Sequence, residues 1–197
     1  MGVFLRLLVG LVLVVGLAGG GVYVLSQQQP SVAAGLKTVP VSSAAARSFD
    51  DKVKALEAAA AAAKASGTAA PVTATFTEAE LTSAANQASS GTSGGLAATG
   101  TQIHLSGGNV IATSNVTVQG VTIPIGVVAT PTVVNGQVQM VVQQIQTGAL
   151  PLPQSLTQQI QAQVGQAISP SALGIPMDVS SLQIQNGQLV LTGTTQP

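Results

Sequence analysis

The chain has 197 residues, a formal net charge of zero and charged side chains at only 6% of its positions. The zero net charge argues against long-range attraction of nucleic acid, and an aromatic content of 2% leaves few stacking platforms for bases. A hydrophobic content of 46% is enough for a folded core, and the lack of cysteine excludes disulfides and thiol nucleophiles.

An apolar run opens the chain. No residue from Leu7 to Leu25 is charged, and the run is close to the roughly 20 residues that cross a bilayer core. It is longer than the apolar part of a cleaved secretory signal, about 7–15 residues, which is the alternative reading. We therefore expect residues 1–25 to form a transmembrane signal anchor. The protein would then be a single-pass protein of the cell membrane, with its C-terminal domain outside the cytoplasm.

A linker and an alanine-rich helix are predicted next. Residues 26–47 have the Gln, Pro, Ser and Ala content of a linker. Ser48 fits a helix N-cap and Gly67 fits the position after a helix, so residues 48–67 are predicted to form a helix or stalk. Its apolar stripe has helical spacing: Phe49, Val53, Leu56 and Ala60. Because alanine dominates beyond Leu56, we expect this helix to bury little area.

Residues 68–197 are predicted to form an extracytoplasmic domain. Apolar and polar residues alternate from 71 to 76, which indicates a short strand. Thr77-Glu78-Ala79-Glu80 has the form of a capping box and predicts a helix from Glu78 to about Ala88. Glu78 and Glu80 fall on different sides of such a helix, so capping explains them better than acid/base catalysis does.

Alternating apolar residues then predict several strands. The clearest strand runs from Val121 to Thr130, and Pro124 within it marks an edge or a bulge. Asn135-Gly136 predicts a type I′ hairpin. Its register sets Val133 opposite Val138, Pro131 opposite Met140 and Ala129 opposite Val142.

A long helix is predicted between this hairpin and the last one. Apolar residues recur at every fourth position around Pro153–Ile168, namely Leu152, Leu156, Ile160, Val164 and Ile168. Asn186-Gly187 predicts the last hairpin, with Ile184 opposite Leu189 and Leu182 opposite Leu191. The predicted fold class is α+β. It consists of an N-terminal transmembrane helix, then an antiparallel curved sheet of about six strands packed on the long amphipathic helix.

Titratable groups are scarce in the second half of the chain. From Leu81 to Pro197 the one charged side chain is Asp178 and the one histidine is His104. His104 falls on the polar side of its predicted strand without a second ligand nearby, and Asp178 fits a turn after Pro176-Met177. We expect no catalytic residue, no metal site and no cofactor, and hence a protein that is not an enzyme.

Several motifs resemble a known family. They are FTEAELTSAAN at residues 76–86, LPLP at 150–153 and the closing hairpin LQIQNGQLVLTGT at 182–194. Over roughly residues 71–195 this order resembles the bacterial LmeA/YpmS-type extracytoplasmic proteins, which are related to the tubular lipid-binding (TULIP-like) fold. The resemblance implies an apolar groove between a curved sheet and a long helix, and it carries over no catalytic residue. The chain departs from that pattern in being poorer in charge.

The function expected from these features is binding of lipid or another apolar ligand by a membrane-anchored domain. A buried ligand chain contributes about 0.8 kcal/mol for each methylene. The side chains predicted to line the groove come from two strands and the long helix: Ile123, Ile125, Val127, Val138, Met140, Leu156, Ile160 and Val164. On the residue pattern alone, the same side chains fit a closed core better. The alternative function is that of a structural cell-envelope scaffold or a protein-interaction module with a closed core.

Overall fold

The computed structural model describes residues 30–89, 96–118, 121–147, 150–151 and 177–196. The described helices are α2 (Ser43–Ser66) and α3 (Glu78–Ser89), preceded by a 3-10 turn, η1 (Ser31–Ala33). The strands in chain order are β1 (Pro71–Thr77), β2 (Leu96–Ser106), β3 (Asn109–Val118), β4 (Val121–Val134), β5 (Gln137–Thr147), β6 (Leu150–Pro151), β7 (Met177–Gln185) and β8 (Gln188–Thr195).

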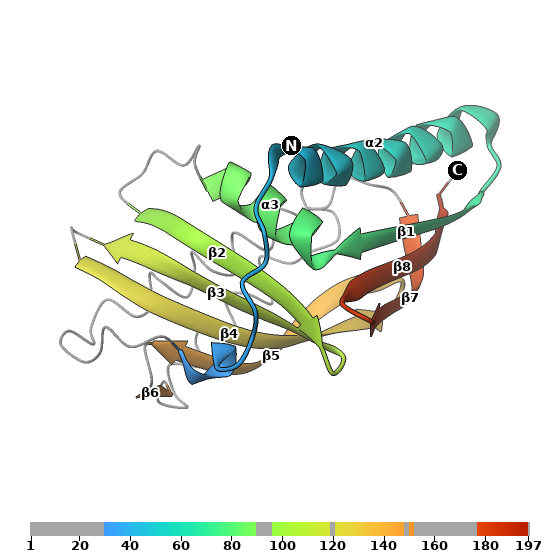
Figure 1. Cartoon of the computed structure of the whole chain (residues 1–197). Coiled ribbons are helices and arrows are strands. Elements are labelled where there is room, and N and C mark those ends of the chain that lie inside the picture. Colours follow the sequence, from blue (N-terminus) through green and yellow to red (C-terminus); the bar gives the residue numbers. More distant parts are fainter. Residues whose placement is uncertain (1–29, 90–95, 119–120, 148–149, 152–176, 197) are drawn as a thin grey trace.

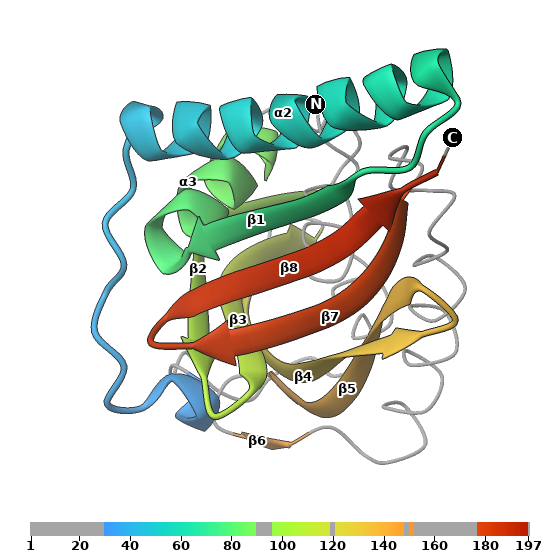
Figure 2. The same ribbon diagram turned by 90° about the vertical axis from the view of Figure 1, so that its right-hand side faces the viewer.

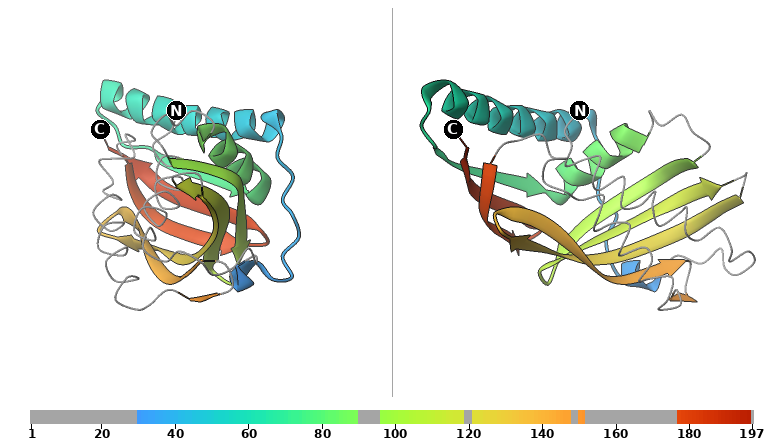
Figure 3. Two further views of the ribbon diagram at one scale, coloured as in Figure 1. Left: turned by 90° about the vertical axis from the view of Figure 1, so that its left-hand side faces the viewer. Right: turned by 180° about the vertical axis from the view of Figure 1, so that it is seen from behind.

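The strands form two antiparallel sheets (Figure 1). The three-stranded sheet has the order β1-β8-β7, and the five-stranded sheet has the order β2-β3-β4-β5-β6. Helix α2 lies along β1 and packs on α3, which in turn packs on β2 (Figure 2). The five-stranded sheet extends well past the smaller sheet, so the two overlap over only part of its length (Figure 3).

Helix α2 begins earlier than predicted. Ser42, and not Ser48, is the N-cap, and its hydroxyl accepts a hydrogen bond of 3.1 Å from the Ala45 amide. The three alanines that follow are strong helix formers and extend the helix at this end. Gly67 ends it with a φ of 65°, as predicted. The predicted apolar stripe is the buried face of α2, and Ala46 and Ala63 extend it.

The capping box between β1 and α3 is confirmed. The Thr77 hydroxyl accepts from the Glu80 amide at 3.2 Å, and a carboxylate oxygen of Glu80 accepts from the Thr77 amide at 2.8 Å. This exchange satisfies two amides that a helix start leaves without partners. It also ends β1 and turns the chain directly into α3.

Both Asn-Gly hairpins have the predicted register. Asn135 and Asn186 have φ values of 52° and 51°, and the glycines after them have 76° and 70°, as a type I′ turn requires. In the first hairpin the partners are Val133 and Val138, Pro131 and Met140, and Ala129 and Val142. In the second hairpin they are Leu182 and Leu191, and Ile184 and Leu189.

The predicted fold class is wrong. Instead of one curved sheet of about six strands on a long amphipathic helix, the chain forms two sheets, because β8 pairs with β1 and not with a strand of the larger sheet. Within the described ranges, no helix is both long enough and apolar enough to cross a bilayer. The transmembrane helix predicted at residues 1–25 and the amphipathic helix predicted at Pro153–Ile168 lie outside the described residues. The helices that the structure does show against the sheets are α2 and α3.

Candidate functional site

The inner face of the five-stranded sheet is mostly apolar, apart from the buried hydroxyls of Thr101 and Ser114, which lie 3.0 Å apart. Side chains directly opposite one another on paired strands share a face, so the register defines rows across the sheet. One buried row is Ile103, Ala112, Val127 and Ile145. The next buried row is Leu105, Val110, Ala129 and Val142.

A β-bulge in β5 keeps this face apolar. The pairing shifts between Val128 and Ala129, so that Gln143 is an extra residue on β5. Gln143 and Gln144 are both exposed, and Ile145 beyond them is buried opposite Val127. Without the extra residue, Ile145 would point to the outer face. The adjacent glutamines after an alternating run are the sequence signal that could have predicted the bulge.

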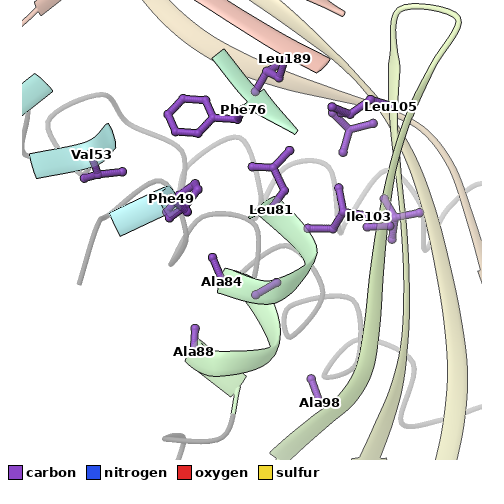
Figure 4. Close-up of a cluster of buried hydrophobic side chains, with 14 of the residues drawn as sticks. Phe49, Val53, Phe76, Leu81, Ala84, Ala88, Ala98, Ile103, Leu105 and Leu189 are labelled. Carbon is purple, nitrogen blue, oxygen red and sulfur yellow. The ribbon is translucent and has the colours of Figure 1, made fainter. Parts of the chain in front are cut away.

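The main hydrophobic core joins this inner face to the rest of the domain. Phe49 of α2, Phe76 of β1, Leu81 of α3 and Leu189 of β8 pack in one cluster with the rows just described (Figure 4). The rings of Phe49 and Phe76 are 5.2 Å apart between centroids and tilted, a favourable geometry for aromatic pairs.

A second, smaller hydrophobic cluster joins the two sheets at the β4–β5 turn, and we call it the side cluster. Its buried members are Val138 of β5, Val179 of β7 and Leu191 of β8. Three partly buried side chains pack against them: Val133, Met177 and Leu182. The Val179 amide also donates a hydrogen bond of 2.8 Å to the Gly136 carbonyl oxygen.

The structure separates the side chains that were predicted to line a groove. Ile125 and Val127 lie in the main core, and Met140 is partly buried against it. Val138 lies in the side cluster instead. Ile123 stands opposite Val116 in the β3–β4 ladder. The helical candidates lie outside the described residues: Leu156, Ile160 and Val164.

Glu80 is a buried carboxylate that joins α2 to α3. Its side chain is 8% exposed, and it accepts hydrogen bonds from the Ser48 hydroxyl and from the Lys52 ammonium group. The Lys52 Nζ atom lies 2.7 Å from the nearer carboxylate oxygen. Burial by itself raises the pKa of Glu80, but the hydrogen bonds from Lys52, Ser48 and Thr77 and the charge of Lys52 outweigh it, so the pKa is lowered. Glu80 thus has a structural role, in which it holds α2 against α3.

Glu78, Thr82 and Asn86 line the edge of β2. A carboxylate oxygen of Glu78 accepts from the Leu105 amide at 2.7 Å. The Thr82 hydroxyl accepts from the Ile103 amide at 2.9 Å and also donates to the Ile103 carbonyl. The Asn86 amide group bonds both the amide and the carbonyl of Thr101. Sequence reasoning missed this role, although the spacing of four residues marks one face of the helix.

His104 and Asp178 do not come together in a site. His104 was predicted on a polar side, yet it is buried on the outer face of the five-stranded sheet, opposite Ile111. Asp178 is exposed and accepts a hydrogen bond of 2.9 Å from the Gln196 side chain. Among the residues that the structure describes, no group of three or more His, Asp or Glu could hold a metal ion.

Residues 30–42 form a strap across the outer face of the five-stranded sheet (Figure 1). The strap follows one cross-strand row: Gln102, Thr113, Gly126 and Gln146. The Val39 amide donates to the Gln102 side chain at 2.7 Å, and the Val32 amide donates to the buried Gln146 side chain at 3.0 Å. Gly126 allows the strap to approach the sheet closely, since a Cβ there would lie 2.5 Å from a methyl carbon of Val32. The sequence predicted only a linker here, although glycine inside a strand is a signal of close approach.

The fold is a two-sheet domain, and its candidate binding surface is the apolar inner face of the larger sheet. The chain belongs to the LmeA-like phospholipid-binding family, whose model matches residues 3–194. This result confirms the resemblance and supports lipid binding as the general function. Neither a curated protein nor a solved structure matches the chain.

Proposed function

We propose that the domain binds the acyl chains of a phospholipid against the inner face of the five-stranded sheet. The observation that carries the proposal is the continuous apolar surface on β4 and β5 in a member of a phospholipid-binding family. The side chains concerned are Ile125, Val127, Met140, Val142 and Ile145. The proposal concerns only the sheet and does not include the helix predicted at Pro153–Ile168.

The energetics favour recognition of the acyl chains over recognition of the headgroup. Each methylene moved from water to an apolar surface contributes about 0.8 kcal/mol, so ten methylenes offset much of the cost of association, about 4–15 kcal/mol. From Leu81 to Pro197 the sequence has no lysine or arginine to pair with a phosphate. We therefore expect weak discrimination between phospholipids with different headgroups and the same acyl chains.

Two further expectations from the sequence stay predictions. One is that the domain works outside the cytoplasm, and the other is that it catalyses no reaction. The second follows from the scarcity of titratable groups, because acid/base and nucleophilic chemistry needs them in clusters. A purified protein that hydrolysed a phospholipid would contradict it.

The proposal can be tested with tryptophan reporters, because the chain has no tryptophan of its own. Met140 is partly buried on the inner face, and its neighbour Val141 is 44% exposed on the outer face. We expect phosphatidylglycerol with brominated acyl chains to quench the fluorescence of the Met140→Trp variant saturably. The Val141→Trp variant is the matched control, and its fluorescence should change little because the bromine atoms stay on the other side of the sheet.

The same experiment separates lipid binding from the scaffold alternative. A scaffold with a closed core predicts no saturable quenching in either variant and no phospholipid in an organic extract of the purified protein. Equal quenching of both variants would place the lipid on the outside of the molecule and contradict binding to the inner face. Both variants should first show the circular dichroism spectrum of the parent protein.

A further inference from the structure

The side cluster is separate from the main core. The buried residues of the two clusters are different, and among the described residues only Leu182 packs against both. One backbone hydrogen bond accompanies the side cluster, from Val179 to Gly136. Gly136 also lies close to Asp178, since a Cβ on this glycine would be 3.0 Å from a carboxylate oxygen.

The opposite side of the sheet pair is joined far more firmly. There β1 continues without a break into α3, and α3 is bonded to the edge of β2 through Glu78, Thr82 and Asn86. Phe76 and Leu81 add buried apolar contacts to this junction. At the side cluster, by contrast, the described contacts between the sheets are a small apolar cluster and the hydrogen bond from Val179 to Gly136, although Leu182 and Ile184 of β7 also pack on the main core.

The side cluster lies at one end of the apolar row along β5. Val138 belongs to the side cluster, and Met140, Val142 and Ile145 follow it on the same face. Separation of β7 from the β4–β5 turn would uncover Met140 first and the deeper side chains next.

We propose that the side cluster is a gate for acyl chains, which opens as β7 moves away from the β4–β5 turn. This inference rests on the proposed function. It predicts that a covalent link across the side cluster slows both uptake and release of lipid, while the affinity for lipid changes little. A cluster that only adds stability predicts no such kinetic effect.

The absence of cysteine from the sequence makes a reversible lock possible. In the Val138→Cys/Val179→Cys variant, oxidation or a short bismaleimide links β5 to β7. We expect the linked protein to take up phosphatidylglycerol with a fluorescent NBD group on one acyl chain at least about tenfold more slowly, because a locked gate limits entry. Reduction of the disulfide should restore the original rate, which also shows that the double variant is folded.

The matched control links two strands of one sheet. Thr117 and Thr122 stand opposite each other in β3 and β4 with their hydroxyl oxygens 2.9 Å apart, so a Thr117→Cys/Thr122→Cys pair can form a disulfide without joining the two sheets. This link should leave the uptake rate unchanged. Val133 and Met177 both pack on the side cluster, so a bismaleimide link in a Val133→Cys/Met177→Cys variant provides a second lock.

The outcomes distinguish the gate from the proposed function. If the parent protein takes up no probe, the proposed function fails. If the parent protein takes up the probe, and linked and reduced proteins do so at equal rates, lipid binding stands and the gate is wrong. If both double-cysteine variants fail to take up the probe even without a cross-link, the side cluster is needed for the bound state itself, which also contradicts a gate.

Discussion

Glu80 shows how a single carboxylate can join three elements. It accepts hydrogen bonds from Ser48 and Lys52 of α2 and from Thr77 at the end of β1, while it stands in the first turn of α3. A buried carboxylate stays ionised only where such partners replace water. Lys52 also donates to the Thr75 carbonyl oxygen at 2.6 Å, which extends the network to β1.

Replacement of Glu80 by glutamine keeps the shape of the side chain and removes its charge. We expect Glu80→Gln to lower the free energy of unfolding by about 1–3 kcal/mol, the cost of weakening buried charge-assisted hydrogen bonds. The effect stays moderate because the Lys52 side chain is 36% exposed and keeps some of its hydration. Urea unfolding followed by circular dichroism measures it. Glu57→Gln, on the exposed face of α2, is the control and should change little.

The lowered pKa of Glu80 also predicts a dependence on pH. Its pKa in the folded protein is below the ordinary value of 4.5. The stabilisation is therefore complete above the unfolded pKa and is lost as the pH falls through the folded pKa. Between about pH 5 and about pH 3 the parent protein should lose more stability than Glu80→Gln. Parallel curves of stability against pH for the two proteins would contradict this role.

Helix α3 serves the edge of β2 as a neighbouring strand would. Glu78, Thr82 and Asn86 are spaced by four residues, about 6 Å along a helix. Their partners Leu105, Ile103 and Thr101 are spaced by two residues, about 6.8 Å along a strand. The near match lets one helix face satisfy alternate backbone groups of the strand. It also protects an edge on which another chain could otherwise pair.

Thr82 is the sharpest test of this arrangement, because its side chain is fully buried and bonds both the amide and the carbonyl of Ile103. Thr82→Val keeps the size of the side chain and leaves both backbone groups without this partner. We expect a loss of about 1–3 kcal/mol in the free energy of unfolding. Thr73→Val, on the exposed side of β1, should leave the stability almost unchanged, and an equal loss in both variants would contradict the argument.

The strap is held by side chains of the sheet that it crosses. Gln146 is buried, and both atoms of its amide group bond Ser31. Gly126 lies beneath Pro30 and Val32, where any Cβ would overlap with the strap. The strap is therefore part of the folded domain.

Gly126→Ala should release the strap without removing a single hydrogen-bonding group. The new methyl group would lie 2.5 Å from Val32 and 2.7 Å from Pro30, so the strap must shift away from the sheet. Lys37 lies exposed within the strap, and trypsin cleavage after it should become severalfold faster in the variant. Gln144→Ala, on the same outer face beside the strap row, is the control. Unchanged cleavage in Gly126→Ala would show that the strap does not depend on this contact.

At the scale of the whole molecule, the sequence correctly predicted the features that depend on interactions between residues close together in the chain. The two Asn-Gly turns set the register of their hairpins, and the Thr77–Glu80 box set the start of α3. These features depend on residues within about a dozen positions of one another. The apolar inner face of β4 was predictable for the same reason, because alternation within a single strand carries it.

The prediction failed where distant segments choose partners. No sequence pattern near Gln188 indicates that β8 pairs with β1, and the predicted single sheet was wrong for that reason. The strap was missed because its partners, Gln102 and Gln146, lie far along the chain. Val138 fell into the side cluster because β7 approaches the β4–β5 turn, a contact between the two sheets that no local pattern contains.

The pairing of β1 with β8 has a consequence for biosynthesis. Pro71 stands opposite Thr194, so the smaller sheet unites strands that lie far apart in the sequence. β2 to β5 follow one another and pair in order, and they can assemble on the ribosome soon after they emerge. β1 must wait for its partner until the final hairpin has been translated. A nascent polypeptide halted before Gln188 would therefore present β1 with an open edge to chaperones or to other chains.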